Sequence, residues 1–371
     1  MRVLHVYRTY FPDTQGGLEE TIRQICRNCQ PLGIKSRVLS LTPEHKASVV
    51  RFDEADVYRY PISVDIRSCG MSVKALTGFR SLSGWADIVH YHYPWPFADM
   101  LHFSSRITNP TVVTYHSDII RQRLLRTFYE PLKWQFLRKV NKIVATSENY
   151  FSSSATLARL SEKVEIIPIG LDEKSYPVPT QSRIEVMRNN VGEGFFLFIG
   201  VLRSYKGLGI LLEAMRETDL KLVIAGSGPI QGKLKQQATE QHLSNVQFMG
   251  QISDEDKMAL IKLSCAVVLP SNLRSEAFGV SLVEASMYGK PLICTEIGTG
   301  TSFVNIHNET GLIVAPNDPT ALHNAMETLN EDKTLAMRLG RGARNRYEAL
   351  FTGKRMGRKY ADLYRHISKL S

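Results

Sequence analysis

Short runs rich in β-branched residues alternate with amphipathic helical stretches along almost the whole chain. This alternation is typical of parallel β-sheets whose strands are joined by crossover helices. The pattern occurs twice, once in each half of the sequence. Ligands of such sheets bind in loops at the carboxyl ends of the strands. The sequence therefore predicts an α/β fold with two doubly wound, Rossmann-like domains that face a central cleft.

Twelve runs are predicted to form the strands of these domains. In the first half the predicted strands are 3–7, 37–41, 87–92, 111–115, 142–146 and 164–167. In the second half they are 195–199, 221–225, 246–249, 266–269, 292–295 and 312–314. The total of 371 residues is more than one hydrophobic core usually serves, which also favours two domains. Pro177 and Pro179 interrupt the periodicity and predict the boundary.

The chain is basic, with 46 Lys and Arg against 36 Asp and Glu. Most of the excess lies in residues 1–140, and such a field attracts nucleic acid, anionic lipid or phosphate-bearing small molecules alike. The sequence contains no recognised nucleic-acid module, and the cations of the second half lie in short glycine loops. We therefore expect no nucleic-acid partner, although a nucleic-acid-binding protein stays the non-enzymatic alternative.

Several classes of protein are disfavoured by what the chain lacks. No apolar run approaches the roughly 18 residues that a membrane helix needs, and no export signal is visible. The five cysteines are odd in number and scattered, which argues against a disulfide framework. Cys26 and Cys29 form a C-x-x-C without a second ligand pair, so zinc or redox chemistry is disfavoured. A cytoplasmic location is expected.

Paired glycines follow the first predicted strand. Gly16 and Gly17 stand immediately before a helical stretch, where exposed backbone N–H groups and the helix dipole favour an anion. The chain lacks the spacing of the common nucleotide-binding loops at this point. The pair therefore predicts either a phosphate-binding turn or a tight turn between strand and helix.

Two cations lie in a glycine-bounded loop after the first strand of the second half. Arg203 and Lys206 stand three residues apart between Gly200 and Gly207. Arginine can chelate an oxyanion and lysine acts as a point charge, so the pair suits a diphosphate. The alternative is a pair of solvated basic residues on a surface loop.

Two glutamates follow the predicted strand 266–269. Gly279 separates Glu276 from Glu284, so we expect Glu276 in a loop and Glu284 on a helix. A carboxylate can accept hydrogen bonds from two vicinal hydroxyls, which is how proteins hold a ribose or a sugar ring. The backbone amides of Gly279, Val280 and Ser281 are expected to meet a phosphate at the helix start.

In their order along the chain, these motifs resemble those of the retaining GT-B glycosyltransferases of family 4. The resemblance extends to the turn 167–172 and to the glycine-bearing strand end 225–229, so it covers essentially the whole chain. It implies a GT-B fold with an acceptor-binding domain at 1–175 and a nucleotide-sugar donor domain at 176–353. The helix 354–371 is expected to cross back to the first domain. The chain departs from the family in the spacing of Gly200 to Arg203.

The resemblance also implies roles for individual residues. Arg203 and Lys206 match the cations that neutralise the donor diphosphate, and Glu284 matches the carboxylate that holds the ribose. Glu276 matches the glutamate beside the donor sugar, where nucleophile and binder both stay open. His116 matches the histidine that reaches the donor sugar. The candidate acceptor contacts are Asp118, His92 and Tyr10.

Two of these residues have structural alternatives. His116 and Asp118 both follow the predicted strand 111–115. A histidine in this position is often a hydrogen-bonded structural group, and an aspartate can be a helix N-cap. The sequence alone leaves both interpretations open.

The resemblance implies that a hexose is transferred with retention and that no metal or other cofactor is required. The loop 296–305 is similar to that of bacterial mannosyltransferases that build lipopolysaccharide O-antigen from GDP-mannose. We therefore expect mannose transfer from GDP-mannose to a lipid-linked saccharide acceptor. The alternatives are a family 4 transferase that uses a UDP-sugar (GlcNAc, glucose or galactose) for another surface polysaccharide, and a GT-B epimerase.

Basic and large apolar residues mix at near-helical spacing in the segment 121–139. A helix of this composition can lie on an anionic leaflet and bring the enzyme close to a lipid-linked acceptor. The segment predicts peripheral attachment to the cytoplasmic face of a bacterial inner membrane. The alternative is an amphipathic crossover helix with a solvated basic face.

Overall fold

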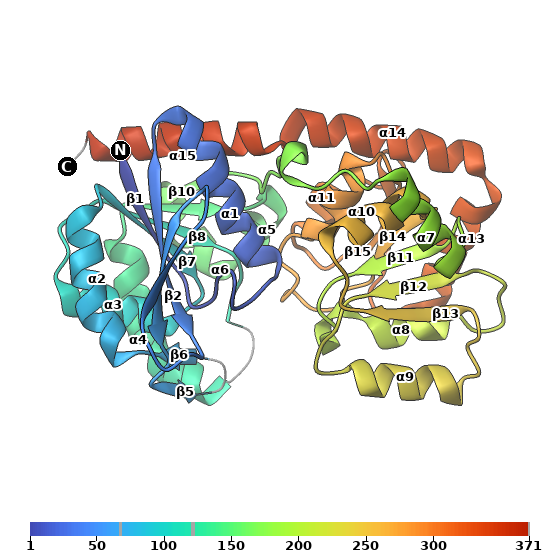
Figure 1. The fold of residues 1–371 in the computed structure, drawn as a ribbon, viewed down its shortest axis with the longest axis horizontal. Coiled ribbons are helices and arrows are strands. Elements are labelled where there is room, and N and C mark those ends of the chain that lie inside the picture. The colour runs from blue at the N-terminus through green and yellow to red at the C-terminus, as the bar shows by residue number, and fades with distance from the viewer. Residues whose placement is uncertain (67–68, 120–122, 370–371) are drawn as a thin grey trace. The chain divides into compact units, whose positions relative to one another are not determined.

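The computed structural model describes residues 1–66, 69–119 and 123–369, without the side chains of 123–128. The chain forms two compact units (Figure 1). Unit 1 comprises Met1–Gly170 together with the chain from Gly353 onward, and unit 2 comprises Leu171–Thr352. The units therefore change at 170/171 and 352/353, whereas the sequence predicts boundaries at 175/176 and 353/354.

Unit 1 is built on a twisted sheet that, in the described residues, has the strand order β10-β9-β8-β7-β1-β2-β4-β3. Neighbouring strands run parallel except β3, which pairs antiparallel with β4 at the edge. A separate hairpin consists of β5 and β6. The strands of unit 1 are β1 (Arg2–Val6), β2 (Lys35–Thr42), β3 (Ser48–Arg51), β4 (Asp56–Pro61), β5 (Val64–Ile66), β6 (Cys69–Met71), β7 (Ile88–Tyr93), β8 (Thr111–Tyr115), β9 (Lys142–Ala145) and β10 (Val164–Ile166).

The last helix of the chain completes the core of unit 1. Helix α15 (Gly353–Ser368) lies beside α1 (Gly17–Cys29), and Met356, Tyr360 and Tyr364 pack against residues of β1, β7 and β8 (Figure 1). The close approach needs glycine, because a Cβ on Gly357 would lie 2.5 Å from the backbone oxygen of Asn28. The other helices of unit 1 are η1 (Gln30–Leu32), α2 (Val73–Trp85), α3 (Pro96–Ser105), α4 (Arg123–Lys139), α5 (Glu148–Ser153), α6 (Ala155–Ala158) and η2 (Ser161–Lys163).

Unit 2 is built on an all-parallel sheet with the strand order β13-β12-β11-β14-β15-β16. Its first strand lies in the middle, so the chain moves outward in one direction, returns, and moves outward in the other. This is the doubly wound order, in which the first and fourth strands flank the switch point where ligands bind. The strands are β11 (Phe196–Ile199), β12 (Leu222–Ala225), β13 (Val246–Gly250), β14 (Ala266–Leu269), β15 (Leu292–Thr295) and β16 (Gly311–Val314).

The helices of unit 2 alternate with its strands, as crossover connections require. Many begin at a residue that can cap them: Ser253, Asp318 and Asp332 each accept a hydrogen bond from a backbone N–H of the first turn. The helices are η3 (Glu173–Ser175), α7 (Gln181–Val191), η4 (Ser204–Lys206), α8 (Leu208–Ala214), α9 (Gln231–Glu240), α10 (Asp254–Leu263), α11 (Val280–Met287), α12 (Thr301–Val304), α13 (Pro319–Glu331) and α14 (Lys333–Leu350).

The predicted fold class is confirmed, and each of the twelve predicted strands is present within a residue or two of its predicted bounds. The sequence did not reveal β3, β4, β5 and β6. Strand β4 was hidden because it carries Arg59 on its buried face, and an arginine breaks the apolar alternation that identifies a half-buried strand.

Candidate functional site

The loops at the carboxyl end of the unit 2 sheet are packed backbone against backbone. Gly207 has a φ of +69°, and a Cβ there would lie 1.9 Å from the oxygen of Pro270. Gly226 has a φ of +136°, and a Cβ there would lie 2.0 Å from the oxygen of Gly200. The loops that follow β11, β12 and β14 therefore meet at the switch point of this sheet, where only glycine fits at the contacts.

A buried ion pair occupies this end of the sheet. Lys206 ends η4 after β11, and its Nζ pairs with Glu276 in the loop between β14 and α11. The two side chains are 13% and 10% exposed. The hydroxyl of Ser271 also donates to Glu276, at 3.4 Å. The structure thus brings together two residues that the sequence predicted to act at one site.

The surroundings of Lys206 keep it charged. Burial by itself lowers the pKa of this ammonium group, but the charge of Glu276 and the hydrogen bond to it raise the pKa above its ordinary value. Arg203 lies on the same loop with an exposed side chain, which makes no hydrogen bond or ion pair in the described residues. The loop therefore offers one fixed positive charge and one guanidinium that can approach an anion.

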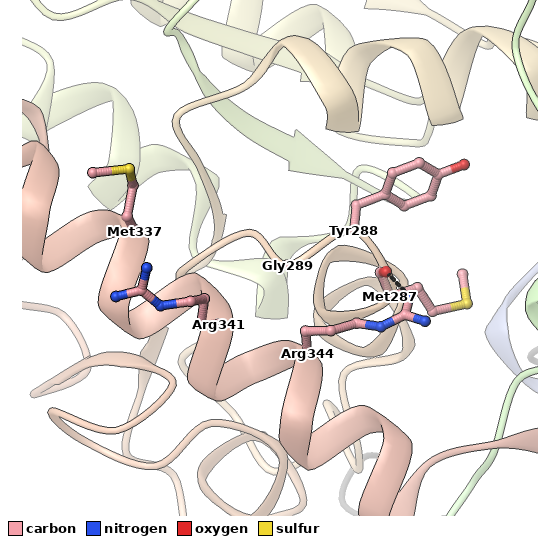
Figure 2. Close-up of a pocket in the computed structure, with 6 residues that line it drawn as sticks. All are labelled: Met287, Tyr288, Gly289, Met337, Arg341 and Arg344. Atoms are coloured by element: carbon pink, nitrogen blue, oxygen red, sulfur yellow. Dashed lines mark hydrogen bonds between the residues drawn. The ribbon is translucent and has the colours of Figure 1, made fainter.

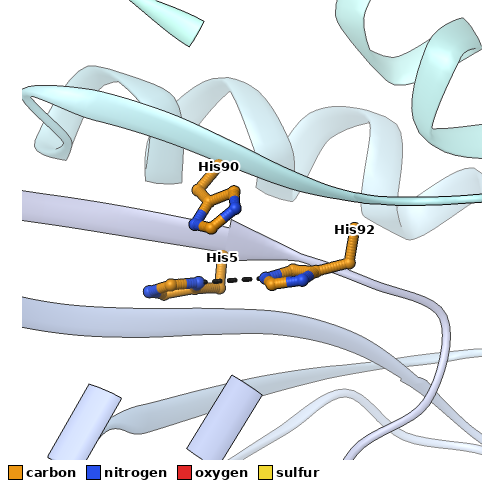
Figure 3. A group of neighbouring side chains, drawn as sticks. All are labelled: His5, His90 and His92. Atoms are coloured by element: carbon orange, nitrogen blue, oxygen red, sulfur yellow. Dashed lines mark hydrogen bonds between the residues drawn. The ribbon is translucent and has the colours of Figure 1, made fainter. Parts of the chain in front are cut away.

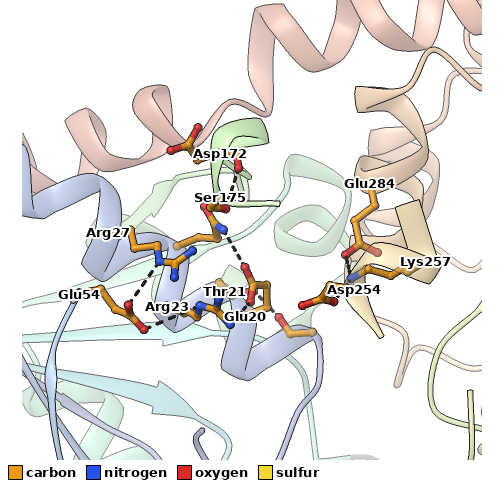
Figure 4. A network of polar contacts seen from close by, with 12 residues as sticks. Glu20, Thr21, Arg23, Arg27, Glu54, Asp172, Ser175, Asp254, Lys257 and Glu284 are labelled. Carbon is orange, nitrogen blue, oxygen red and sulfur yellow. Dashed lines mark hydrogen bonds and ion pairs between the residues drawn. The ribbon is translucent and has the colours of Figure 1, made fainter. Parts of the chain in front are cut away.

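A second buried ion pair lies on the helix that follows. Glu284 is on α11 and is 5% exposed, and its Oε1 accepts a hydrogen bond from Lys257 on α10 at 2.8 Å (Figure 4). Lys257 also lies 3.0 Å from Asp254 and 5.1 Å from the centre of the Tyr176 ring. Burial lowers the pKa of Lys257, and the two carboxylates outweigh that effect and raise it. The other oxygen of Glu284 has no partner in the described part of the chain.

The start of α11 provides backbone donors beside these pairs. The helix begins at Val280 after Gly279, whose φ is +89°, and no side chain caps it. The first N–H groups of a helix, here those of Val280 and Ser281, have no partner within the helix. Glu276, this helix start and Glu284 are consecutive along one loop and helix, as the sequence predicts. The arrangement can bind an anion at the helix start and hydroxyl groups at a carboxylate.

The paired glycines of unit 1 have a different environment. Helix α1 begins at Gly17 after the extended Gly16, and a Cβ on Gly16 would lie 2.8 Å from a carboxylate oxygen of Glu19. Thr14 donates to the other oxygen of Glu19 at 2.9 Å. Because a negative side chain already lies at this helix start, the structure favours the tight turn over the phosphate-binding turn.

A residue that the sequence did not indicate holds this loop. Arg59 on β4 is 5% exposed and pairs with Asp13 of the loop before α1 through two of its nitrogens. It also pairs with Glu44 at 2.9 Å. The hydrogen bonds that Arg59 donates to these carboxylates raise its pKa. The sequence did not indicate Arg59 because strand β4 was not predicted, and an arginine outside a predicted strand is expected on the surface.

Four histidines cluster on the unit 1 sheet, on the neighbouring strands β1 and β7 and directly after β8. His5 Nδ1 lies 3.1 Å from His92 Nε2, and His92 Nδ1 lies 3.1 Å from His116 Nε2. The three side chains are 1%, 0% and 7% exposed in that order. Burial lowers the pKa of His5 and that of His116 to about 3, so these imidazoles are neutral at physiological pH. The predicted residue His116 thus ends a row of hydrogen-bonded imidazoles.

The fourth histidine lies beside this row and bonds elsewhere. The nitrogens of His5, His90 and His92 fall within 4.8 Å of one another, a spacing that a metal ion would accept (Figure 3). Both nitrogens of His90 are already used, at 2.7 Å from Tyr364 Oη and 2.7 Å from Thr114 Oγ1. A metal ion bound by His90 would have to replace one of these two hydrogen bonds. Hydrogen bonding therefore explains the close spacing of these histidines without a metal.

The three residues predicted to contact the acceptor are buried or half-buried, whereas a residue that binds an acceptor has to be accessible to it. Tyr10 and His92 are both fully buried, so neither side chain is on the surface. Asp118 is half-buried and accepts hydrogen bonds from Tyr115 at 2.8 Å and Ser154 at 3.0 Å, and Tyr150 lies 3.2 Å away. In this structure Asp118 ties the loop after β8 to α5 and α6. Ile119 is not helical, so Asp118 is not a helix N-cap.

One pocket of unit 2 lies apart from these groups. It has a volume of about 460 Å³ and is open on one side, between the end of α11 and helix α14 (Figure 2). Arg344 is oriented by the backbone oxygen of Met287 and by Glu173 and Glu348. The lining contains none of the predicted site residues and consists of Met287, Tyr288, Gly289, Met337, Arg341 and Arg344.

Each unit matches a known protein family. Residues 15–175 match the family described as Glycosyltransferase Family 4, and residues 181–346 match the family described as Glycosyl transferases group 1. Sucrose-phosphate synthase from Thermosynechococcus elongatus superimposes with a TM-score of 0.82 over 100% of both chains at 20% identity. At that identity the similarity shows the fold alone.

Two curated relatives are similar over nearly the full length. D-rhamnosyltransferase WbpZ of Pseudomonas aeruginosa is 50% identical over 95% of this chain and 92% of its own length. O-antigen chain mannosyltransferase C of Escherichia coli is 44% identical over 98% of both chains. Similarity of this extent is not confined to one unit, so it includes the loops that carry the candidate residues.

Proposed function

The chain belongs to the GT-B glycosyltransferases of group 1 and family 4, and we propose that it transfers mannose from GDP-mannose to a lipid-linked saccharide acceptor. The transfer would add to the O-antigen of lipopolysaccharide, a proposal supported by the relative that is 44% identical, which is named an O-antigen chain mannosyltransferase. The observation that carries the proposal is the pair of Lys206 and Glu276 at the switch point of the unit 2 sheet, beside Arg203.

The charges in this loop suit the leaving group of glycosyl transfer. When the glycosidic bond to a nucleoside diphosphate breaks, negative charge develops on the diphosphate. Lys206 is held charged by its environment, and Arg203 has an exposed guanidinium that can chelate a phosphate. These two cations supply the neutralisation that a metal ion supplies in other enzymes. We therefore propose that the reaction needs no metal.

The carboxylates suit the rest of the donor. We assign Glu284 to the ribose hydroxyls, since one of its oxygens has no protein partner in the described residues and the other is fixed by Lys257. The N–H groups of Val280 and Ser281 would meet a phosphate at the start of α11. Glu276 is paired with Lys206 and bonded by Ser271, which supports binding of the sugar in preference to attack on it.

We assign to His116 a hydrogen bond to the donor sugar. Its imidazole is neutral and buried to 7% exposure, so it can offer a hydrogen bond without adding charge. We propose that the acceptor hydroxyl attacks on the face from which the diphosphate leaves, which retains the anomeric configuration.

The identity of the sugar has a second candidate. The relative that is 50% identical is named a D-rhamnosyltransferase, and D-rhamnose is mannose without its 6-hydroxyl group. The two candidate donors therefore differ at one position of the sugar. A site that hydrogen-bonds the 6-hydroxyl would discriminate strongly against the deoxy sugar, whereas an apolar contact would discriminate weakly.

The test is a transfer assay with purified protein and a panel of donors. The panel contains GDP-mannose, GDP-D-rhamnose, UDP-GlcNAc, UDP-glucose and UDP-galactose, each with a lipid-linked saccharide acceptor and with a chelator present. We expect GDP-mannose to give the highest kcat/KM and the product to keep the donor's anomeric configuration by NMR. A higher kcat/KM for GDP-D-rhamnose would support the second candidate, and transfer only from UDP-sugars would contradict both.

We also propose that the enzyme works at a membrane surface. None of the described helices is both long and apolar enough to span a bilayer. In the described part of the segment 121–139, Phe136 and Leu137 are buried, so that face packs inward as in a crossover helix. Residues 121–122 and the side chains of 123–128 lie outside the described residues. Exposed apolar side chains occur instead on strand β5 of the β5–β6 hairpin, at Val64 and Ile66.

Vesicle flotation tests this attachment. We expect binding to vesicles with anionic lipid, weaker binding to neutral vesicles, and loss of binding when Val64→Asp and Ile66→Asp are combined. Equal and negligible binding to both kinds of vesicle would contradict the membrane proposal and leave the transfer proposal intact.

A further inference from the structure

The row of three imidazoles in unit 1 is continuous from the interior to the residue that the proposed function places at the sugar. His5 is on β1, His92 is on β7 and His116 follows β8, and these strands are neighbours in the sheet. Each contact is 3.1 Å, within the range of a hydrogen bond. His116 is the most exposed of the three, at 7% against 1% and 0%.

A row of neutral imidazoles has only two consistent hydrogen-bond patterns. Each neutral ring has one N–H donor and one bare nitrogen acceptor, so each contact needs a donor on one side and an acceptor on the other. Choosing the proton position on His5 therefore fixes it on His92, and His92 fixes it on His116. The tautomer of the outermost ring is set by a ring two contacts away.

The environment of His5 selects between the two patterns. His5 Nε2 makes no hydrogen bond in the described residues, while Nδ1 faces His92. No acceptor of the described chain lies at Nε2, so a proton there would have no protein partner, whereas a proton on Nδ1 has His92. The proton of His5 is thus on Nδ1, which donates to His92 Nε2, and His92 Nδ1 donates to His116 Nε2. The proton of His116 is then on Nδ1, the nitrogen not used within the row.

We propose that His5 and His92 are positioning residues that hold His116 in the Nδ1–H tautomer, so that His116 presents a hydrogen-bond donor to the donor sugar. This inference rests on the role assigned to His116 in the proposed function. His90 is not part of the row, because both its nitrogens bond to Tyr364 and Thr114. The row therefore has no branch through which the pattern could be reversed.

Nitrogen NMR of the full-length protein with labelled histidine reads the tautomer directly. The signals of the His116 ring nitrogens are assigned as those that disappear in His116→Gln. We expect these signals to show a single species with the proton on Nδ1. His92→Leu removes the donor to His116 Nε2, so the signals should shift toward a mixture of tautomers. His5→Leu should cause a smaller shift in the same direction, because His92 then loses only its own partner.

Kinetics supply the second readout. We expect His92→Leu to lower kcat about fivefold to tenfold, the effect of losing about one net hydrogen bond, with an unchanged KM for the nucleotide sugar. His5→Asn keeps an amide at the position of Nδ1 and should recover most of the rate lost in His5→Leu. The control is His102→Gln, since His102 is a buried histidine bonded to Tyr91 outside the row.

The outcomes separate the inference from the proposed function. An unchanged His116 tautomer in folded His92→Leu and His5→Leu proteins would overturn the inference, whatever the activity. A changed tautomer with an unchanged kcat would overturn it as well. Absence of transfer by the unaltered protein with every nucleotide sugar would overturn the proposed function, and the NMR spectra would still report the tautomer. If His92→Leu does not fold, His5→Leu and His5→Asn carry the same test.

Discussion

The carboxyl end of the unit 2 sheet holds two lysine–glutamate pairs, whereas the same end of the unit 1 sheet holds neutral imidazoles. Both sheets place their first strand in the middle and reverse direction there. In unit 2 the loops carry Lys206 with Glu276, and helices α10 and α11 carry Lys257 with Glu284. In unit 1 the strands carry His5, His92 and the adjoining His116.

The difference shows how one topology serves two kinds of ligand. Buried charges need counter-charges, and Lys206 and Lys257 each have a carboxylate that a charged ligand can reinforce or partly replace. Burial removes the charge from the imidazoles of unit 1, which suits hydroxyl groups of a sugar but not a phosphate. The fold fixes where a ligand can bind, and the side chains fix the chemistry of the ligand.

The largest expected effect comes from removing the charge of Lys206. Lys206→Ala should lower kcat roughly 10²-fold, as loss of one preorganised charge contact does. The measurement is the transfer rate at saturating donor, with thermal unfolding to show that the protein is folded. Glu276 is left buried without its partner, so the melting temperature should also fall.

The matched control for this comparison is Lys290→Ala. Lys290 lies before β15, at the opposite end of the same sheet, and its Nζ donates to the backbone oxygens of Lys262 and Ser264. We expect this variant to lose stability and to keep the unaltered kcat once folded. Equal rates in the Lys206→Ala and unaltered proteins would break the contrast between the two units.

The next largest effect is expected at Glu284. Glu284→Gln keeps the shape of the side chain and removes the charge, so the donor KM should rise roughly 10- to 30-fold, the cost of a hydrogen bond to a charged group. Asp254→Asn is the control, because it removes the other carboxylate near Lys257, one that is 39% exposed. Equal changes in KM for the two variants would show that the effect passes through Lys257 instead of through the ligand.

Acid should act on unit 1 through its histidines. Burial holds the pKa of His5 and that of His116 near 3, so below a pH of about 6.5 the unfolded chain binds protons that the folded chain does not. Stability should therefore fall as the pH drops from about 6.5 toward 3, by roughly 1.4 kcal/mol per pH unit for each imidazole. The pKa values of Lys206 and Lys257 are raised, so these groups do not titrate in that range.

Thermal unfolding at pH 7.5 and pH 5.5 measures this effect. The decrease in melting temperature between the two pH values should be smaller in His5→Leu than in the unaltered protein. Arg183→Ala, which removes a partly buried ion pair of unit 2 with Asp256, should leave the decrease unchanged. The same decrease in His5→Leu as in the unaltered protein would contradict the assignment of acid sensitivity to the row.

The smallest effect is expected at Asp118. Its carboxylate accepts hydroxyl hydrogen bonds from Tyr115 and Ser154 within unit 1, so Asp118→Asn should cost about 1 kcal/mol of stability. The rate of transfer should change by less than about threefold, because these contacts are internal to the unit. A rise in the acceptor KM well beyond threefold, with stability unchanged, would support the contact between Asp118 and the acceptor that the family resemblance implies.

Sequence patterns predicted the parts of the fold that depend on local order. Most of the predicted strands are short, largely apolar runs, and burial on both faces of a sheet requires such runs whatever the neighbours are. The Lys206 loop and the segment from Glu276 to Glu284 were also visible, since their residues are close together in the chain. Strand β4 was missed because the partner that allows Arg59 to be buried, Asp13, lies 46 positions away.

The sequence by itself determined two doubly wound units and the charges available at the ends of their strands. Only the tertiary structure decided which of those groups are paired, buried or neutral. His5 and His92 each look like an ordinary strand residue, and Asp118 looks like a helix cap, until the strands are aligned side by side. Hydrogen bonds and desolvation depend on distances of a few ångströms between residues far apart in the chain, and that information exists only once the chain has folded.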